Sequence, residues 1–260
     1  MRLCGIECGC RRKSKVKRSE VVMQVDGCIA FVSGANRGLG ACFVKKLLEQ
    51  GARKVYAGAR DISVLDDRDP RIVPVALDIT NAEQVARAAA LASDANLLVN
   101  NAGINRLEPA LAATDLNAAR AEMEVNYFGT LNMIRAFAPS LRLSGGAIIN
   151  VSSIFARVAL PAMASLCASK AAALRMTEAV RAELAPHGVR VLSILPGAID
   201  TDMSRDFPPP KIPVVDVVHA AFAALRGASD EVYVGAMAQQ IAAGLATDRQ
   251  AVQLSFARGA

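Results

Sequence analysis

Short runs of apolar residues alternate with longer Ala- and Leu-rich stretches along most of the chain. The short runs are apolar at nearly every position, which is typical of strands covered on both faces, and they lie at residues 28–33, 54–59, 72–77, 95–100, 146–152 and 189–195. The stretches between them predict helices at residues 39–50, 81–93, 115–143, 164–186 and 214–226. Alternating strands and helices form parallel sheets with right-handed crossovers, so we expect one doubly wound α/β domain with helices on both faces.

The pattern is less regular toward the C-terminus. The segment FPPPKIP at residues 207–213 predicts a loop, because proline fits neither a helix interior nor a central strand. The segment EVYVG at residues 231–235 predicts a short seventh strand, and residues 236–254 predict a weak helix.

Composition adds to this picture mainly through the placement of charge. Apolar residues make up 53% of the 260 residues, which is enough for a large core, and no run of about 18 apolar residues predicts a membrane span. The formal net charge is +6, but residues 1–18 hold seven Lys or Arg and one acidic residue. The rest of the chain has no basic excess, so we expect no nucleic-acid partner.

The N-terminal segment is basic and holds three of the six cysteines, Cys4, Cys8 and Cys10. We predict a disordered tail at residues 1–26, or an over-long start before Met23, followed by one domain at residues 27–260. No histidine lies near these cysteines, so we expect no metal site. No long apolar segment follows the basic run, and the other cysteines are scattered as in a reduced protein, so we expect a cytoplasmic location.

The first predicted strand runs into the segment SGANRGLG at residues 33–40. Gly34, Gly38 and Gly40 lie between that strand and an amphipathic helix. Glycines there let backbone N–H groups and a helix N-terminus approach a pyrophosphate, although glycine also marks ordinary turns. The position directly after the first strand of an α/β chain favours a nucleotide-binding loop.

Further motifs follow along the chain, each at the end of a predicted strand or on a predicted helix: ALDIT at 76–80, NNAG at 100–103, VNYFGT at 125–130, INVSS at 149–153 and PGAIDT at 196–201. Together with the glycine spacing, they resemble the short-chain dehydrogenase/reductase family from residue 28 to about residue 203. The resemblance implies a Rossmann-type sheet of about seven strands in the order 3-2-1-4-5-6-7, and an oxidoreductase with a nicotinamide cofactor.

The resemblance also implies roles for individual residues. Asn126, Ser153 and Lys170 match catalytic positions of the family, and Asp78 matches the acidic residue near the adenine ring. The implied cofactor-binding residues are Gly34, Asn36, Arg37, Gly38, Leu39, Gly40, Arg60, Asp78, Ile79, Asn101, Ala102, Gly103, Lys170, Pro196, Gly197, Ile199 and Thr201.

The end of the second predicted strand bears on the choice of cofactor. NAD-binding proteins of this architecture usually carry an acidic residue there, which bonds the ribose 2′-OH. Here the strand ends in Ala59 and Arg60, followed by Asp61, and Arg37 lies in the glycine loop. Both arginines could be solvated surface residues, but two guanidinium groups suit a 2′-phosphate, so we predict NADP(H) in preference to NAD(H).

The proton donor of the resembled family is absent. The family places a tyrosine thirteen residues after the serine and four before the lysine, and both counts lead to Leu166. Cys167 lies about 100° away from Leu166 on a helix and should face packing. The proton would then come from water or Lys170, unless the substrate is an iminium, which needs hydride but no acid.

Three interpretations follow from these residues. The first is an NADP(H)-dependent oxidoreductase acting on a small carbonyl/alcohol or imine/iminium substrate. The second is a pseudoenzyme that binds NADP(H) as a sensor or partner subunit, and the third is this fold with non-redox chemistry. The glycine loop and the arginines favour the first two, and the retained catalytic residues favour the first. The resemblance also implies a homodimer or homotetramer through the helices at 115–143 and 164–186, and residues 203–213 predict an apolar lid.

Overall fold

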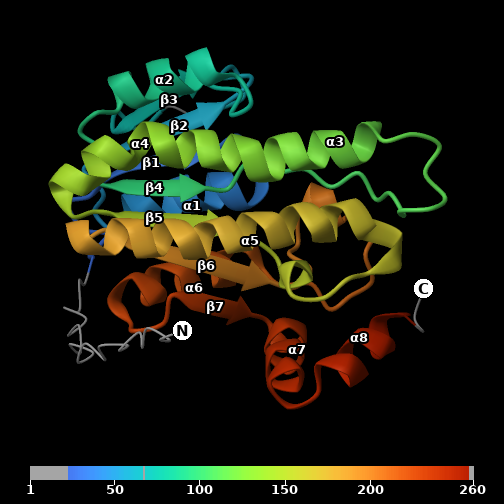
Figure 1. Cartoon of the computed structure of the whole chain (residues 1–260). Coiled ribbons are helices and arrows are strands. Elements are labelled where there is room, and N and C mark those ends of the chain that lie inside the picture. Colours follow the sequence, from blue (N-terminus) through green and yellow to red (C-terminus); the bar gives the residue numbers. More distant parts are fainter. Residues whose placement is uncertain (1–22, 67, 258–260) are drawn as a thin grey trace, which may run out of the picture.

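Seven parallel strands form one sheet at the centre of the computed structural model, which describes residues 23–66 and 68–257 (Figure 1). The strands are β1 (Ile29–Ser33), β2 (Lys54–Ala59), β3 (Ile72–Ala76), β4 (Leu97–Asn100), β5 (Ala147–Val151), β6 (Arg190–Pro196) and β7 (Glu231–Val234). Their order across the sheet is β3-β2-β1-β4-β5-β6-β7, and each lies within two residues of its predicted ends. The predicted fold class and strand order are therefore confirmed.

The direction of chain progression reverses between β1 and β4, which pair side by side. β2 and β3 follow on one side of β1, whereas β5, β6 and β7 follow on the other side of β4. In open α/β sheets of this kind, ligands bind outside the carboxyl ends of the strands at the point of reversal. The topology alone thus indicates where a site should be sought.

Helices cover both faces of the sheet (Figure 1). One face carries α1 (Gly38–Glu49) and α6 (Val214–Arg226), and the other carries α2 (Ala82–Leu91), α4 (Thr130–Ser144) and α5 (Ala164–Leu184). None of the helices within the described ranges is both long and apolar enough to cross a membrane.

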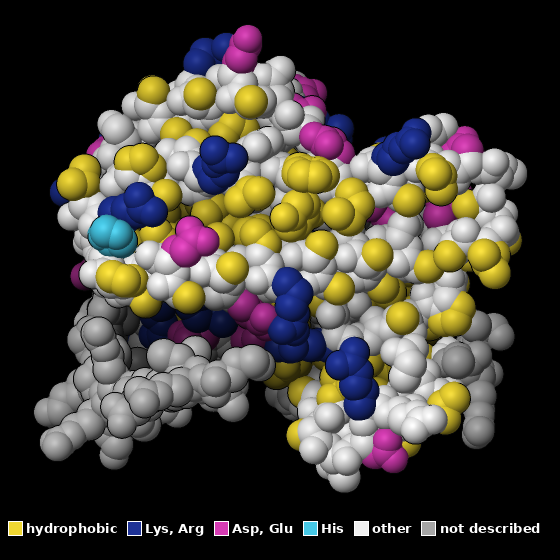
Figure 2. Space-filling model, in the orientation of Figure 1, with side chains coloured by type: hydrophobic (Ala, Val, Ile, Leu, Met, Phe, Trp, Pro, Cys, Tyr) yellow, Lys and Arg dark blue, Asp and Glu magenta, His cyan; other side chains and the backbone are white. Residues whose placement is uncertain are grey.

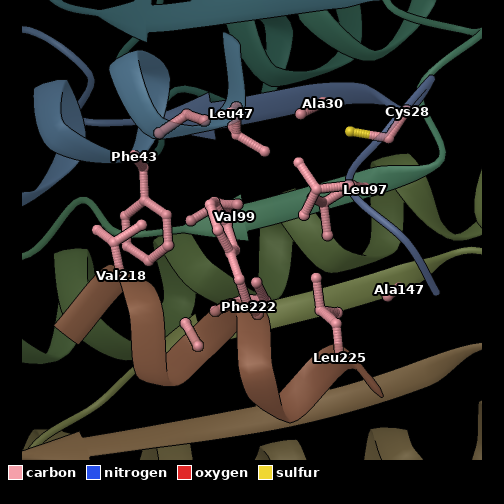
Figure 3. Packing of buried hydrophobic residues seen from close by; sticks show 14 of the residues in the cluster. Cys28, Ala30, Phe43, Leu47, Leu97, Val99, Ala147, Val218, Phe222 and Leu225 are labelled. Atoms are coloured by element: carbon pink, nitrogen blue, oxygen red, sulfur yellow. The ribbon is translucent and has the colours of Figure 1, made fainter. Parts of the chain in front are cut away.

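The core beneath α1 and α6 holds the start of α1 in place (Figure 3). Phe43 of α1 and Phe222 of α6 are 0% and 1% exposed, and their rings meet edge to face with centroids 5.9 Å apart. Leu47 and Val99 are fully buried in the same cluster. Each such side chain contributes about 1.5–3 kcal/mol by leaving water. This packing fixes α1 on β1 and β4, and so fixes the turn between β1 and α1.

The helix predicted at residues 115–143 is divided in the structure. It consists of α3 (Asn117–Met123), a π-helical turn at Glu124–Gly129, and α4. Gly129 is pressed against Ile79, since a Cβ on this glycine would lie 2.7 Å from the Ile79 side chain. A π-helical turn inserts one residue into a helix and often occurs at functional sites. Here the turn contains Asn126, whose backbone oxygen accepts a hydrogen bond from Thr130 Oγ1 at 2.9 Å.

The core begins before the predicted domain boundary at residue 27. Met23 and Val25 are 9% and 3% exposed and pack in the cluster beneath α1 and α6, and Met23 N donates to Leu225 O at 3.2 Å. The tail prediction was therefore wrong for residues 23–26, because two alternating apolar residues are too short a pattern to indicate packing. Residues 1–22, with Cys4, Cys8 and Cys10, lie outside the described residues.

The C-terminal helix predicted at 236–254 is also divided. The structure has α7 (Ala236–Thr247) and α8 (Arg249–Ala257), which pack on each other and are separated by Asp248. The backbone of Asp248 is extended, and its Oδ1 accepts a hydrogen bond from Ala251 N at 2.9 Å, as a helix-capping aspartate does. The break therefore turns α8 back onto the body of the domain.

Candidate active site

A cavity of about 530 Å³ opens at the carboxyl ends of the strands, where the strand order reverses. Loops after β1, β2, β3, β4, β5 and β6 contribute to its wall, together with the start of α5. All the residues predicted to bind the cofactor line this cavity except Gly40. Ser153, Leu166 and Lys170 line it as well, whereas Asn126 lies behind its wall, 2% exposed.

The glycine turn after β1 has the geometry of a phosphate-binding loop. Gly34 and Gly38 have φ values of +65° and +53°, a region that favours glycine. A Cβ on Gly40 would lie 2.0 Å from Gly34 O, so only glycine lets α1 approach the turn this closely. No side chain caps the N-terminus of α1, where Arg37 is the N-cap residue. The first N–H groups of α1 are therefore left to an anion, as a pyrophosphate requires.

Ser33 and Asn101 tie this glycine turn to the end of β4. Ser33 Oγ accepts hydrogen bonds from Asn101 N at 3.1 Å and Ala102 N at 3.2 Å. Asn101 Nδ2 donates to Ser33 O and Gly34 O, both at 3.1 Å. The side chain of Asn101, predicted beside the adenine ribose, is thus committed to holding the turn, and the cavity is shaped by protein contacts alone.

The two arginines predicted to meet a 2′-phosphate differ in their surroundings. Arg60 is exposed at the cavity wall and forms no hydrogen bond or ion pair with the described residues. Arg37 Nη1 instead lies 3.1 Å from Asp202 Oδ2, in an ion pair whose side chains are 70% and 53% exposed. Asp202 also pairs with Arg205, and mainly for this reason its pKa is lowered. Arg37 therefore links the glycine turn to the segment after β6, whereas Arg60 is the one of the two arginines that has no ion pair within the described part of the chain.

Asp78 lies at the same end of the cavity. Its Oδ1 accepts hydrogen bonds from Thr80 N at 2.9 Å and Thr80 Oγ1 at 2.7 Å, which fixes the carboxylate in the loop after β3. The carboxylate is a ready hydrogen-bond acceptor for an amino group at this end of the cavity.

Ser153, Leu166 and Lys170 meet at the other end of the cavity. Ser153 Oγ accepts a hydrogen bond from Phe155 N at 3.2 Å, which leaves its own proton free to donate. Lys170 Nζ donates to Val151 O at 3.2 Å and has further protons to give. Leu166, one helical turn before Lys170, is 7% exposed and presents only carbon to the cavity. The site thus holds a hydroxyl and an amine but no phenol.

The charge state of Lys170 depends on its surroundings. Burial lowers the pKa of its ammonium to about 8, and the carboxylate of Glu122 acts in the opposite direction. Cys167 is 5% exposed, its Sγ accepts a hydrogen bond from Leu160 N at 3.3 Å, and burial raises the pKa of its thiol. The prediction that Cys167 faces packing is confirmed.

The wall near Lys170 is mostly apolar. It includes Ile104, Phe155, Leu166, Met203 and Phe207, the last two from the predicted lid. Such a wall suits a small substrate with little polarity beyond its reacting group.

Helix α8 supports this apolar wall from outside. The side-chain amide of Gln253 pairs with the backbone of Ala159: Ala159 N donates to Oε1 at 3.1 Å, and Nε2 donates to Ala159 O at 2.9 Å. Phe256 packs edge to face on Phe155, with ring centroids 6.4 Å apart. The C-terminal helix therefore holds the loop after β5 in place.

The sequence and fold of this chain are similar to those of known proteins. The family model for short chain dehydrogenases matches residues 28–211. A short chain dehydrogenase of Burkholderia cenocepacia, solved in complex with NADP, is 68% identical, with 90% of this chain and 99% of that chain covered and a TM-score of 0.88. A metagenomic short-chain oxidoreductase, also in complex with NADP, is 28% identical, with 80% and 97% covered and a TM-score of 0.69. Carbonyl reductase [NADPH] 2 of Sus scrofa is 34% identical over 187 residues, which are 70% of this chain and 76% of the relative.

The sheet order and the glycine turn define a nucleotide-binding α/β protein of the Rossmann type. Since the family model covers more than half of the sequence, the chain belongs to the short-chain dehydrogenase family. It has the fold of an oxidoreductase of this family, and Leu166 lines the cavity one helical turn before Lys170.

Three residues that shape the site were not predicted. Ser33 was part of the quoted glycine segment but received no role, although a hydroxyl directly before the turn is a signal for a backbone clamp. Asp202 and Glu122 gave no signal, because each looks like a solvated acid in its local sequence.

Proposed function

We propose that this protein is an NADP(H)-dependent oxidoreductase that transfers hydride to or from a small carbonyl/alcohol or imine/iminium substrate. The observation that carries the proposal is that Ser153 and Lys170 line one cavity with the glycine turn, while Leu166 contributes an apolar side chain to the same cavity. This arrangement retains a donor for the reacting atom of the substrate and a cation for the ribose, and it lacks only the phenol.

The described residues fit a dinucleotide with a 2′-phosphate. The uncapped N-terminus of α1 and the close approach at Gly40 suit a pyrophosphate. Arg60 has no ion-pair partner among the described residues and can bind a phosphate without breaking such a pair, whereas Arg37 must first leave Asp202. The NADP complexes of two relatives support the same cofactor. When bound, a reduced nicotinamide supplies the hydride.

The chain's own residues determine what happens to the proton. In carbonyl reduction, the carbon gains a C–H bond, the π electrons of the carbonyl move to its oxygen, and that oxygen must take one proton. Lys170 can give this proton from its ammonium and regain one from water, since its pKa is about 8. When an iminium carbon takes the hydride, the π electrons of the C=N bond become the lone pair of a neutral amine nitrogen, so no proton is needed there. The wall at Leu166 favours this second substrate class.

A second candidate function rests on Leu166 alone. Loss of a general acid removes about 10²–10⁴ in rate, and a protein without turnover could retain Lys170 only to hold the ribose. Such a pseudoenzyme would bind NADP(H) as a sensor or as the partner of an active subunit.

Cofactor titration followed by turnover assays separates these functions. We expect NADPH to bind at least about tenfold more tightly than NADH, and oxidation of bound NADPH with cyclic imines faster than with small ketones. Binding of NADPH without turnover of either substrate panel would favour the pseudoenzyme. Failure to bind either nucleotide would overturn both functions, and the non-redox interpretation would then stand.

We also propose that the protein forms a homodimer or homotetramer through the face made by α4 and α5. Hydrophobic side chains gather over these helices in Figure 2. Leu143 of α4 is 91% exposed, and Phe128, in the π-helical turn before α4, is 47% exposed. A continuous exposed apolar face of this kind is typical of a protein interface. Light scattering at micromolar protein concentration tests this, and a monomeric mass would refute it.

A further inference from the structure

Glu122 is a buried acid that the proposed chemistry does not use. Its residue exposure is 0%, and it is the one charged residue among the buried polar residues of the described ranges. Burying a carboxylate is costly unless it is hydrogen-bonded or paired, so a carboxylate that remains buried has a structural or functional reason to be there.

The contacts of Glu122 explain only one of its two oxygens. Oε1 accepts a hydrogen bond from Arg106 N at 2.6 Å, in the loop that follows the NNAG motif. Oε2 is buried and has no hydrogen-bond partner among the described residues. One turn later, Asn126 binds the same loop: its Oδ1 accepts from Ile104 N at 2.9 Å, and its Nδ2 donates to Ile104 O at 3.0 Å. A neutral amide would hold Arg106 N as well as Glu122 does, so the clamp does not account for the charge.

The interface with α5 accounts for the charge better. Helices α3 and α5 are in contact, and each follows a strand of the parallel sheet, so they run in the same direction. Asn126 Nδ2 also donates to Ser169 Oγ at 3.0 Å, which fixes the register of the two helices. One turn earlier on each helix lie Glu122 and Ser165, and Ser165 Oγ is likewise buried without a partner. The carboxylate therefore faces the first two turns of α5, which carry Lys170.

Lys170 lies close to Asn126, one helical turn beyond Glu122. Its Nζ is close to Gly103, where a Cβ would lie 3.4 Å away, and the same Cβ would lie 3.1 Å from Asn126 Oδ1. No salt bridge joins Glu122 to Lys170, so the two charges interact through space rather than by contact. The Cys167 thiol also lies on this part of α5, and its pKa is raised mainly by burial, with Glu122 acting in the same direction.

We propose that Glu122 is a positioning residue whose buried negative charge keeps Lys170 in its ammonium form at neutral pH. Burial lowers the pKa of the Lys170 ammonium and so favours the neutral amine, whereas Glu122 raises that pKa. The ammonium form predominates below the pKa of about 8 and is lost as the pH rises through it, so removal of the carboxylate moves this loss closer to pH 7. This electrostatic role does not depend on a bound nucleotide, whereas its use in holding the cofactor and giving a proton rests on the proposed function.

The test measures the ionisation of Lys170 directly, without any nucleotide. The full chain is labelled with acetic anhydride at pH values from 6 to 10, and modification of Lys170 is quantified by mass spectrometry. Glu122→Gln keeps an acceptor for Arg106 N and removes the charge, and Glu124→Gln removes an exposed charge two residues away as the matched control. We expect a midpoint near pH 8 in the unaltered protein and in Glu124→Gln. In Glu122→Gln, labelling at pH 6.5 should rise about threefold or more, because half a unit of pKa changes the neutral fraction about threefold.

An unchanged labelling midpoint in a folded Glu122→Gln protein would overturn the proposal, and so would an equal shift in Glu124→Gln. If Glu122→Gln does not fold, Glu122→Asp retains the charge at a greater distance and should move the midpoint in the same direction by less. A midpoint in Glu122→Asp that stays at that of the unaltered protein would then refute the role. NADPH titration over the same pH range tests the proposed function separately. If NADPH does not bind but the labelling midpoint shifts, the proposed function is refuted and the electrostatic role of Glu122 is retained.

Discussion

Replacement of Leu166 by tyrosine would supply the one group that the site lacks. Leu166 lies at the cavity wall, 7% exposed, with Lys170 one helical turn further along α5. The introduced phenol would point along the same wall as the Ser153 hydroxyl, and the Lys170 ammonium would stabilise its phenolate form and so lower its pKa. We therefore expect Leu166→Tyr to accelerate the reduction of small ketones.

The expected gain in reaction rate can be compared with the expected loss of stability caused by the larger side chain. A well-placed general acid contributes about 10²–10⁴ in rate, which corresponds to about 3–5 kcal/mol of barrier height. Overpacking a filled wall costs about 1–3 kcal/mol of stability, but the added atoms can extend into a cavity of about 530 Å³. The gain in rate should exceed the disturbance, so we expect at least a tenfold rise in kcat/KM for ketones and little change for iminium substrates.

The assay is NADPH oxidation with a ketone panel and a cyclic imine panel, each run on Leu166→Tyr and on Leu166→Phe. The phenylalanine variant adds the same ring without the hydroxyl, so the ratio between the two variants isolates the acid. If both variants fold, bind NADPH and reduce ketones equally slowly, the leucine is not simply a missing acid. The site would then have diverged to another substrate or to none.

Three further predictions follow from single features of the fold. Arg60→Ala should weaken NADPH binding about tenfold and leave the affinity for NADH nearly unchanged, while Arg53→Ala, outside the cavity, should affect neither affinity. Equal losses of affinity for both nucleotides would contradict contact of Arg60 with a 2′-phosphate. Gly40→Ala should abolish nucleotide binding and lower Tm, because the added Cβ would clash with the backbone oxygen of Gly34. Gly227→Ala is the control, since a Cβ there meets nothing closer than 3.5 Å, and equal Tm values for the two variants would refute the prediction. Deletion of residues 1–22 should leave Tm and NADPH affinity unchanged by calorimetry, since the described core is closed without them, and a lower Tm would refute that independence.

The sheet could be predicted from the sequence because of how it is buried. Strands covered by helices on both faces need an apolar residue at nearly every position, and CIAFVS and GAIINVS satisfy this without any knowledge of their neighbours. The interruptions of helices could not be predicted in the same way. The π-helical turn at Glu124–Gly129 keeps a locally helical pattern, and the break at Asp248 depends on how α8 packs back onto the domain.

Site residues in the loops were predictable where the backbone itself imposes the residue. Gly40 is required by its distance to a neighbouring turn, and such requirements leave a spacing that is visible in the sequence. Side chains whose role depends on a partner far away in the chain have no recognisable pattern in the sequence around them. Arg37 and Asp202 are 165 residues apart, and the burial of Glu122 depends on α5. Their neighbours in sequence give no sign of either contact.

The support that α8 gives to the loop after β5 has a consequence for how the protein matures on the ribosome. The residues predicted to bind the nucleotide end at Thr201, whereas Gln253 and Phe256, which hold Ala159 and Phe155, are synthesised later. A nascent chain would therefore contain all the predicted nucleotide-binding residues before α8 is available to hold the loop after β5. Helix α8 also lies beyond the segment matched by the family model, which ends at residue 211. Exchange of the C-terminal segment would therefore change the support of the loop after β5 and leave the predicted nucleotide-binding residues up to Thr201 in place.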